Sequence, residues 1–95
     1  MTVTDLSRQE IIDISHDTTL YEWTVQSAMK PLVIDRAKGI YMWDADGKRY
    51  MEFNSQLMCT NIGHGAQRVI DAIRIQLEKV AYVAPTVATT QARAE

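Results

Sequence analysis

The stretch IDRAKGIYMWDADGKRYMEF, residues 34–53, determines the local fold of this chain. Apolar, β-prone residues flank a short loop over 44–48, in which the late glycine Gly47 favours a left-handed backbone position. The pattern predicts an antiparallel hairpin with this loop as its turn. A further β-prone run begins at Leu32, and Gly39 breaks the chain before the hairpin, so the segment predicts two or three antiparallel strands. So small a sheet is marginal alone, and its apolar face needs a partner.

A helical pattern follows the predicted sheet. Val69, Ile73 and Leu77 recur at the spacing of one helix face, while charged residues occupy the other face. This periodicity predicts an amphipathic helix over about 66–82, with these three side chains buried. Beyond it, the sequence becomes a loop and then turns helix-permissive again at residues 91–95.

A shorter helical pattern begins the chain. Thr4 or Asp5 is the expected cap of a helix that ends near His16, and an irregular arm follows. The predicted fold class is therefore an α+β segment. It consists of a helix and arm over 1–30, and a small antiparallel meander with one amphipathic helix over 31–95.

Composition excludes several classes of function. The 95 residues allow one small domain at most, and a net charge of −2 gives no broad electrostatic reason to bind nucleic acid or an anionic membrane. The one cysteine, Cys59, excludes an internal disulfide and fits a reducing compartment. No apolar run reaches the roughly 20 residues that span a bilayer, and the first residues lack a signal-peptide pattern. We therefore expect a cytoplasmic protein.

Two features indicate an incomplete chain. One helix and a small meander cannot cover the large side chains of Trp23, Tyr41, Trp43, Tyr50 and Phe53, since a chain of this length has only a thin core. The final residues also read as the start of a helix without a cap. We therefore expect further protein, or a second subunit, to cover the apolar surface.

Several short motifs have both a chemical and a structural interpretation. Gly63-His64-Gly65 before a helix could bind an anion through backbone N–H groups, although a tight turn is the commoner use of such a motif. Cys59 and His64 could form a nucleophilic pair, and with His16 they could bind a metal, but a free cysteine is usually a small buried apolar group and the metal-ligand spacing is absent.

Carboxylates and aromatic residues also cluster in the hairpin. Asp44 and Asp46 are interpreted as turn residues rather than as paired catalytic carboxylates. Tyr41, Trp43 and Tyr50 could form a platform for stacked bases. We expect no basic surround for these rings, so core packing is the preferred interpretation.

Three strings in fixed order carry a family resemblance. IDRAKGIYMWDADGKRY at 34–50 is followed by Asn61-Ile-Gly-His64 and by a helix containing Gln76-Leu77. Together they resemble class-III aminotransferases, the ω-amino acid type of pyridoxal-phosphate (PLP) enzyme, over about 20–95. The resemblance implies part of a fold type I α/β architecture, assembled as a homodimer. Residues 31–95 would then be the first part of the small domain and the start of the link to the large PLP domain.

The resemblance also implies which site residues this segment contributes. The Schiff-base lysine lies beyond residue 95 in the family, and no lysine here matches it, so we expect no catalytic residue and no activity from the 95 residues alone. Trp23, Leu57 and Met58 match positions of the substrate pocket. Thr86 and Val87 match a loop that reaches towards the neighbouring subunit's site.

Three departures from the family pattern affect the expected substrate. Met58 stands where many relatives have tryptophan, Gln56 replaces a small residue, and Glu52-Phe53 replaces the usual Asp-Gly. The implied reaction exchanges an amino group between an amine or ω-amino acid donor and a keto acid such as pyruvate or 2-oxoglutarate. The alternatives are another fold type I PLP enzyme, namely a racemase, aminomutase or decarboxylase, or a non-enzymatic dimerisation module.

Overall fold

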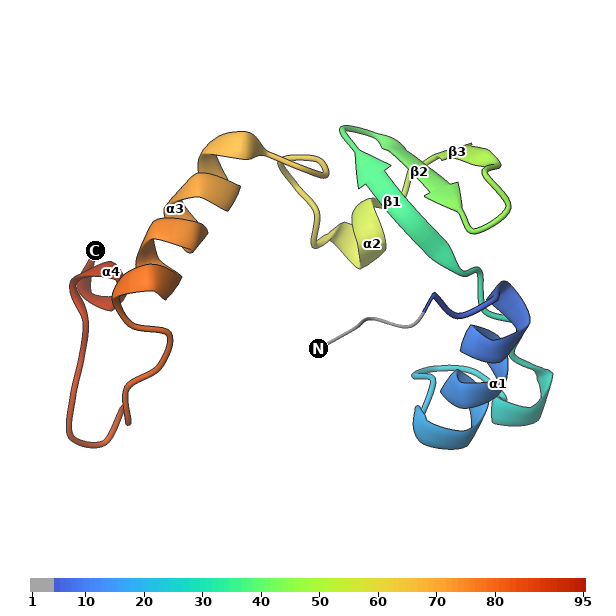
Figure 1. Cartoon of the computed structure of the whole chain (residues 1–95), viewed down its shortest axis with the longest axis horizontal. Coiled ribbons are helices and arrows are strands. Elements are labelled where there is room, and N and C mark those ends of the chain that lie inside the picture. Colours follow the sequence, from blue (N-terminus) through green and yellow to red (C-terminus); the bar gives the residue numbers. More distant parts are fainter. Residues whose placement is uncertain (1–4) are drawn as a thin grey trace. The chain divides into compact units, whose positions relative to one another are not determined.

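The computed structural model of this chain describes residues 5–95, so the expected cap Thr4 lies outside the described residues. The chain divides after His64 into two compact units. The elements follow the order α1 (Arg8–Thr18), a 3-10 turn (Gln26–Ala28), β1 (Ile34–Lys38), β2 (Tyr41–Asp44), β3 (Arg49–Met51), α2 (Ser55–Met58), α3 (Gln67–Lys79) and α4 (Gln91–Ala94) (Figure 1).

A capping box begins helix α1. The Ser7 side chain accepts a hydrogen bond from the Glu10 backbone N–H, and the Glu10 carboxylate accepts one from the Ser7 backbone N–H at 2.8 Å. The two residues satisfy each other's orphan donors because they are three positions apart. The cap expected at Asp5 is therefore wrong, and the helix continues to Thr18, two residues beyond the predicted end.

The three strands form one antiparallel sheet in the order β1-β2-β3, as the sequence predicts. The hairpin between β2 and β3 turns at Gly47, whose φ of 82° confirms the predicted left-handed position. Strand β1 pairs with β2 through an irregularity between Ile34 and Arg36. Strand β1 begins at Ile34, two residues after the start of the β-prone run, although the Val33 carbonyl already accepts a hydrogen bond from the Ala45 N–H at 2.9 Å.

Asp44 is the buried polar residue at the centre of the hairpin, with 7% of its surface exposed. Its Oδ1 accepts hydrogen bonds from the backbone N–H groups of Asp46 and Lys48, at 3.0 and 2.8 Å, and its Oδ2 accepts one from the Tyr50 hydroxyl at 2.8 Å. The Tyr50 hydrogen bond above all lowers the pKa of Asp44, and the same bond raises the pKa of Tyr50. The turn interpretation of Asp44 is confirmed.

Arginine side chains cover the aromatic rings on one side of the sheet. The Arg36 guanidinium lies 3.9 Å from the centre of the Trp43 ring, and that of Arg49 lies 4.7 Å from the Tyr41 ring. Both rings are only half-buried, so they are not core residues within this chain, and the expectation of no basic surround is wrong. Because the guanidiniums occupy the ring faces by cation–π contact, those faces are not free to stack on bases.

No apolar residue is buried within residues 5–95. The amphipathic helix is confirmed as α3, but the predicted burial of its face is wrong for this chain: Val69, Ile73 and Leu77 are 43%, 54% and 57% exposed. The periodicity identifies which face is apolar, whereas burial depends on what packs against it.

Candidate functional site

The residues implied as pocket wall lie in separate parts of the chain. Leu57 and Met58 are neighbours in α2, and both are largely exposed. Trp23 is in the arm before the sheet and is 92% exposed, with a positive φ of 54°. Thr86 and Val87 belong to the second unit, where the N–H of Val87 donates to the Ala84 carbonyl in a turn. Within the first unit, Leu57 and Met58 lie together in α2, and Trp23 lies in the arm.

Helix α2 is a turn of left-handed helix. Its four residues, Ser55–Met58, all have φ between 51° and 65°, and none is glycine. The turn is closed by hydrogen bonds from Met58 N–H to the Asn54 carbonyl at 2.9 Å and from Cys59 N–H to the Ser55 carbonyl at 2.8 Å. A left-handed helix costs L-residues about 1–2 kcal/mol each, so this conformation needs support from its surroundings.

Glu52, directly before the turn, contacts both the turn and a residue twelve positions further on. Its Oε1 accepts hydrogen bonds from the backbone N–H of Gln56 and from the Gln56 side-chain amide, the latter at 3.0 Å. Its Oε2 lies 2.7 Å from His64 Nε2. The His64 hydrogen bond is the first cause that lowers the pKa of Glu52, followed by the two contacts from Gln56. Only 8% of the Glu52 side chain is exposed.

The backbone of His64 is fixed against the sheet. Its N–H donates to the Gly39 carbonyl and its carbonyl accepts from the Gly39 N–H, both at 2.9 Å. The N–H of His64 is thus already paired, which argues against the anion-binding interpretation of the Gly63-His64-Gly65 motif.

The two other interpretations of Cys59 also differ from the structure. His64 pairs with Glu52 rather than with Cys59, and the Cys59 thiol lies 3.5 Å from the Leu57 carbonyl instead. Cys59 is exposed, not the buried apolar group expected from its residue type. A Cys–His nucleophilic pair therefore has no geometric support.

A groove of about 510 Å³ lies between the sheet and the left-handed turn. Met42 and Tyr50 line it from the sheet, and Gln56 and Leu57 line it from the turn. Its wall is mainly apolar, with the Glu52 carboxylate as its one charged group, and such a surface suits a small ligand with an apolar body.

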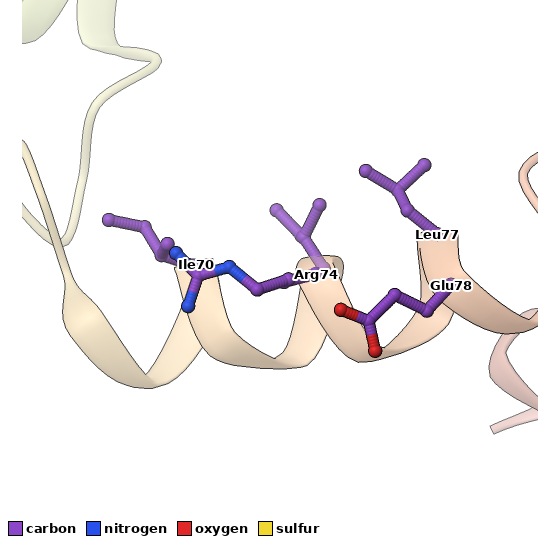
Figure 2. A pocket seen from close by; sticks show the side chains of 5 residues that line it. Ile70, Arg74, Leu77 and Glu78 are labelled. Carbon is purple, nitrogen blue, oxygen red and sulfur yellow. The ribbon is translucent and has the colours of Figure 1, made fainter.

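A second hollow, of about 500 Å³, lies along α3. Figure 2 shows that Ile70, Arg74, Leu77 and Glu78 all extend from this one helix. A hollow lined by a single helix is an uncovered helix face rather than a site with converging polar groups. It therefore gives no candidate chemistry of its own.

The described residues do not make a cofactor or metal site by themselves. The four lysines are all exposed. Residues 5–95 contain no group of three His, Cys, Asp or Glu side chains placed to hold a metal ion. In the same stretch, no helix is long and apolar enough to cross a membrane.

Comparison with known proteins identifies the family. A model of the family described as aminotransferase class-III matches residues 23–95. The chain therefore belongs to the class-III aminotransferases, as the resemblance indicates. The structure also resembles the taurine:2-oxoglutarate aminotransferase of Bifidobacterium kashiwanohense, solved in complex with PLP and glutamate. The TM-score is 0.81 at 33% identity, over 93% of this chain and 20% of that one. The expected α+β segment of a fold type I enzyme is confirmed.

Relatives with curated names include two kinds of enzyme. The chain is 39% identical to the vanillin aminotransferase of Capsicum annuum over 57 residues, which are 60% of this chain and 12% of that protein. It is 42% identical to the glutamate-1-semialdehyde 2,1-aminomutase of Polaromonas naphthalenivorans over 57 residues, or 59% of this chain and 13% of that protein. The chain thus spans about 12% of the length of the curated relatives it matches.

Sequence reasoning missed the cluster of Glu52, Gln56 and His64. Glu52 and Gln56 stand out in the sequence as departures from the family pattern, and His64 stands out within the Gly-His-Gly motif. Nothing local links them, because the contact between Glu52 and His64 depends on how the loop closes back on the sheet.

Proposed function

We propose that this chain is the amino-terminal segment of a PLP-dependent aminotransferase. The enzyme moves an amino group from an amine or ω-amino acid to a keto acid such as pyruvate or 2-oxoglutarate. The observation that carries the proposal is the class-III family match over residues 23–95. The likeness to a taurine:2-oxoglutarate aminotransferase at 33% identity supports it.

In this proposal the segment shapes the substrate pocket and leaves the chemistry to other parts of the protein. When bound elsewhere in the protein, PLP supplies the electron sink of the reaction. Leu57 and Met58 form a wall beside the donor's side chain, and Trp23 covers it from the arm. Met58 is unbranched and adaptable, so we expect this wall to accept donors of different size.

Thr86 and Val87 are proposed to contact the neighbouring subunit of a homodimer. The support is their match to a family loop and their position in an exposed turn after α3, where Val87 is 86% exposed. The cytoplasmic location and the assignment of 31–95 to the small domain stay predictions from the sequence.

Steady-state kinetics of the whole protein tests the reaction. An aminotransferase releases the keto product of the donor before it binds the acceptor, so initial rates at several acceptor concentrations should give parallel double-reciprocal lines. Product formation should also stop when the keto acid acceptor is omitted. Turnover without any acceptor would contradict the proposal.

An aminomutase is the second candidate function, because relatives with that name are 40–42% identical over 57 residues. An aminomutase moves the amino group within one carbon skeleton and so needs no separate acceptor. The acceptor requirement in the same assay therefore distinguishes the two reactions directly.

The wall assignment is tested by enlarging Met58. In the whole protein, Met58→Trp should change the ratio of kcat/KM between a small and an aryl-substituted donor by about tenfold or more, which is about 1.4 kcal/mol of differential transition-state binding. The visible absorbance of the bound cofactor should not change. A donor ratio within about twofold of wild type would mean that Met58 does not line the pocket.

A further inference from the structure

The left-handed turn Ser55–Met58 needs stabilising contacts from residues outside it, because its positive φ angles are unfavourable for L-residues. Its internal hydrogen bonds close the turn at its end, through the N–H groups of Met58 and Cys59. At its beginning, the N–H of Gln56 points to the Glu52 carboxylate instead. A charged acceptor on a backbone N–H gives a stronger hydrogen bond than a neutral one.

The Glu52 carboxylate is itself held from the other side. His64 Nε2 lies 2.7 Å from its second oxygen, and the backbone of His64 is joined to Gly39 by two hydrogen bonds. An ionised carboxylate only accepts, so His64 Nε2 carries the proton of this bond. The Glu52 side chain therefore connects the turn to the corner of the sheet at Gly39.

The Gln56 side chain adds a second connection. Its amide nitrogen donates to Glu52 Oε1 at 3.0 Å and lies 3.3 Å from the Met42 sulfur on strand β2. The backbone of Gln56 is thus held by Glu52, and its side chain is held by Glu52 and by Met42 of the sheet. Leu57 and Met58 follow directly, so their direction depends on how Gln56 is held.

We propose that Glu52 is a positioning residue, which fixes the left-handed turn between Gln56 and His64 and thereby sets the selectivity for the amine donor. This inference rests on the proposed function only for its selectivity part. The positioning part concerns the conformation of the turn and can be measured in a protein of any activity.

The test compares Glu52→Gln with Glu52→Asp in the whole, cofactor-loaded protein. The Gln side chain has the same size but carries no charge. With its oxygen facing Gln56, it presents an N–H group instead of a carboxylate oxygen to His64, so the charge-assisted hydrogen bond to His64 is lost. The Asp side chain keeps both accepting oxygens on a stem shorter by one methylene. Glu78→Gln is the matched control, because it makes the same chemical change at an exposed position of α3.

Hydrogen exchange of the backbone amides over 56–60 reports the conformation of the turn. In Glu52→Gln, these amides should exchange about tenfold faster or more, in Glu52→Asp less so, and in Glu78→Gln at the wild-type rate. An unchanged rate in Glu52→Gln would overturn the proposal. If Glu52→Gln fails to fold, Glu52→Asp alone is compared with wild type, because its shorter stem cannot span Gln56 and His64 as Glu does; unchanged exchange there would overturn the proposal equally.

Donor selectivity is the second measurement. The ratio of kcat/KM between a small and an aryl-substituted donor should shift in Glu52→Gln, in either direction. The ratio should return towards the wild-type value in Glu52→Asp. A merely structural role would lower both rates alike and leave the ratio unchanged, which would overturn the selectivity part. If the wild-type protein transfers no amino group, the proposed function fails, while the exchange rates still decide whether Glu52 holds the turn.

Discussion

At the scale of single residues, the backbone of Gly39 lies so close to Gly63 that a side chain at position 63 has little room. Gly63 has a φ of 78°, and a Cβ placed there would lie 3.2 Å from the Gly39 carbonyl oxygen. Gly39 is the residue that pairs with His64, so a side chain at Gly63 would press on the bridge that holds the Glu52–His64 contact.

This close approach predicts unequal costs for two alanine substitutions. Gly47→Ala meets only the backbone penalty of a positive φ, about 1–2 kcal/mol, since a Cβ there has nothing within 4 Å. Gly63→Ala has the same penalty and a steric contact, which should lower the free energy of unfolding by about 1–3 kcal/mol more. Urea denaturation of both variants of the whole protein checks the difference. Equal losses of unfolding free energy in the two variants would show that the Gly39–His64 bridge shifts without cost.

The hairpin carboxylate predicts a dependence of stability on pH. The folded state lowers the pKa of Asp44 below its ordinary value of 3.8, so the ionised group stabilises the fold above that pH. This stabilisation is lost as the pH falls through the lowered pKa, where the folded state takes up its proton. Asn at this position has no such titration.

The measurement is the unfolding free energy of wild type and Asp44→Asn between about pH 2 and pH 6. The advantage of wild type should be largest at the upper end and should shrink as the pH falls. A difference that stays constant over this range would contradict the account of Asp44.

At the scale of elements, the sequence pattern predicts the elements whose conformation depends on residues only a few positions apart. The hairpin with Gly47 and the helix α3 are both readable, because turn residues and helical spacing act within a few positions. The capping box of α1 was also readable from Ser7 and Glu10, three residues apart, although the apolar pattern pointed to an earlier cap. The left-handed turn α2 was not, since no residue type in it favours a positive φ, and the contacts that stabilise it come from Met42 on β2 and from Glu52, which follows β3.

Helix α3 predicts a contrast between two isoleucines on its opposite sides. Ile73 lies on the stripe with Val69 and Leu77, whereas Ile75 points away from it by helical spacing. Both are 54% exposed in this chain. In the whole protein, we expect the stripe to be covered, so Ile73→Ala should cost about 2–5 kcal/mol and Ile75→Ala less than about 1 kcal/mol.

Thermal or urea unfolding of the two α3 variants gives the comparison directly, with each serving as the control for the other. Equal losses, or a larger loss for Ile75→Ala, would mean that the stripe is not the covered face of the helix.

At the scale of the whole molecule, the exposed apolar surface and the family match both support the interpretation that other protein covers the apolar faces of this segment. Residues 5–95 bury no apolar side chain, and the chain spans about 12% of the length of its curated relatives. Proteins of that length have further chain with which to cover such faces.

The most direct test of the account is the fate of a labelled amino group. The whole protein is incubated with PLP, an amine or ω-amino acid donor labelled with ¹⁵N, and an unlabelled keto acid, either pyruvate or 2-oxoglutarate. We expect the label to appear in the amino acid formed from the keto acid, and only when that keto acid is present. Label that stays on the donor's own carbon skeleton, at a new position or at the original one, would contradict the aminotransferase assignment.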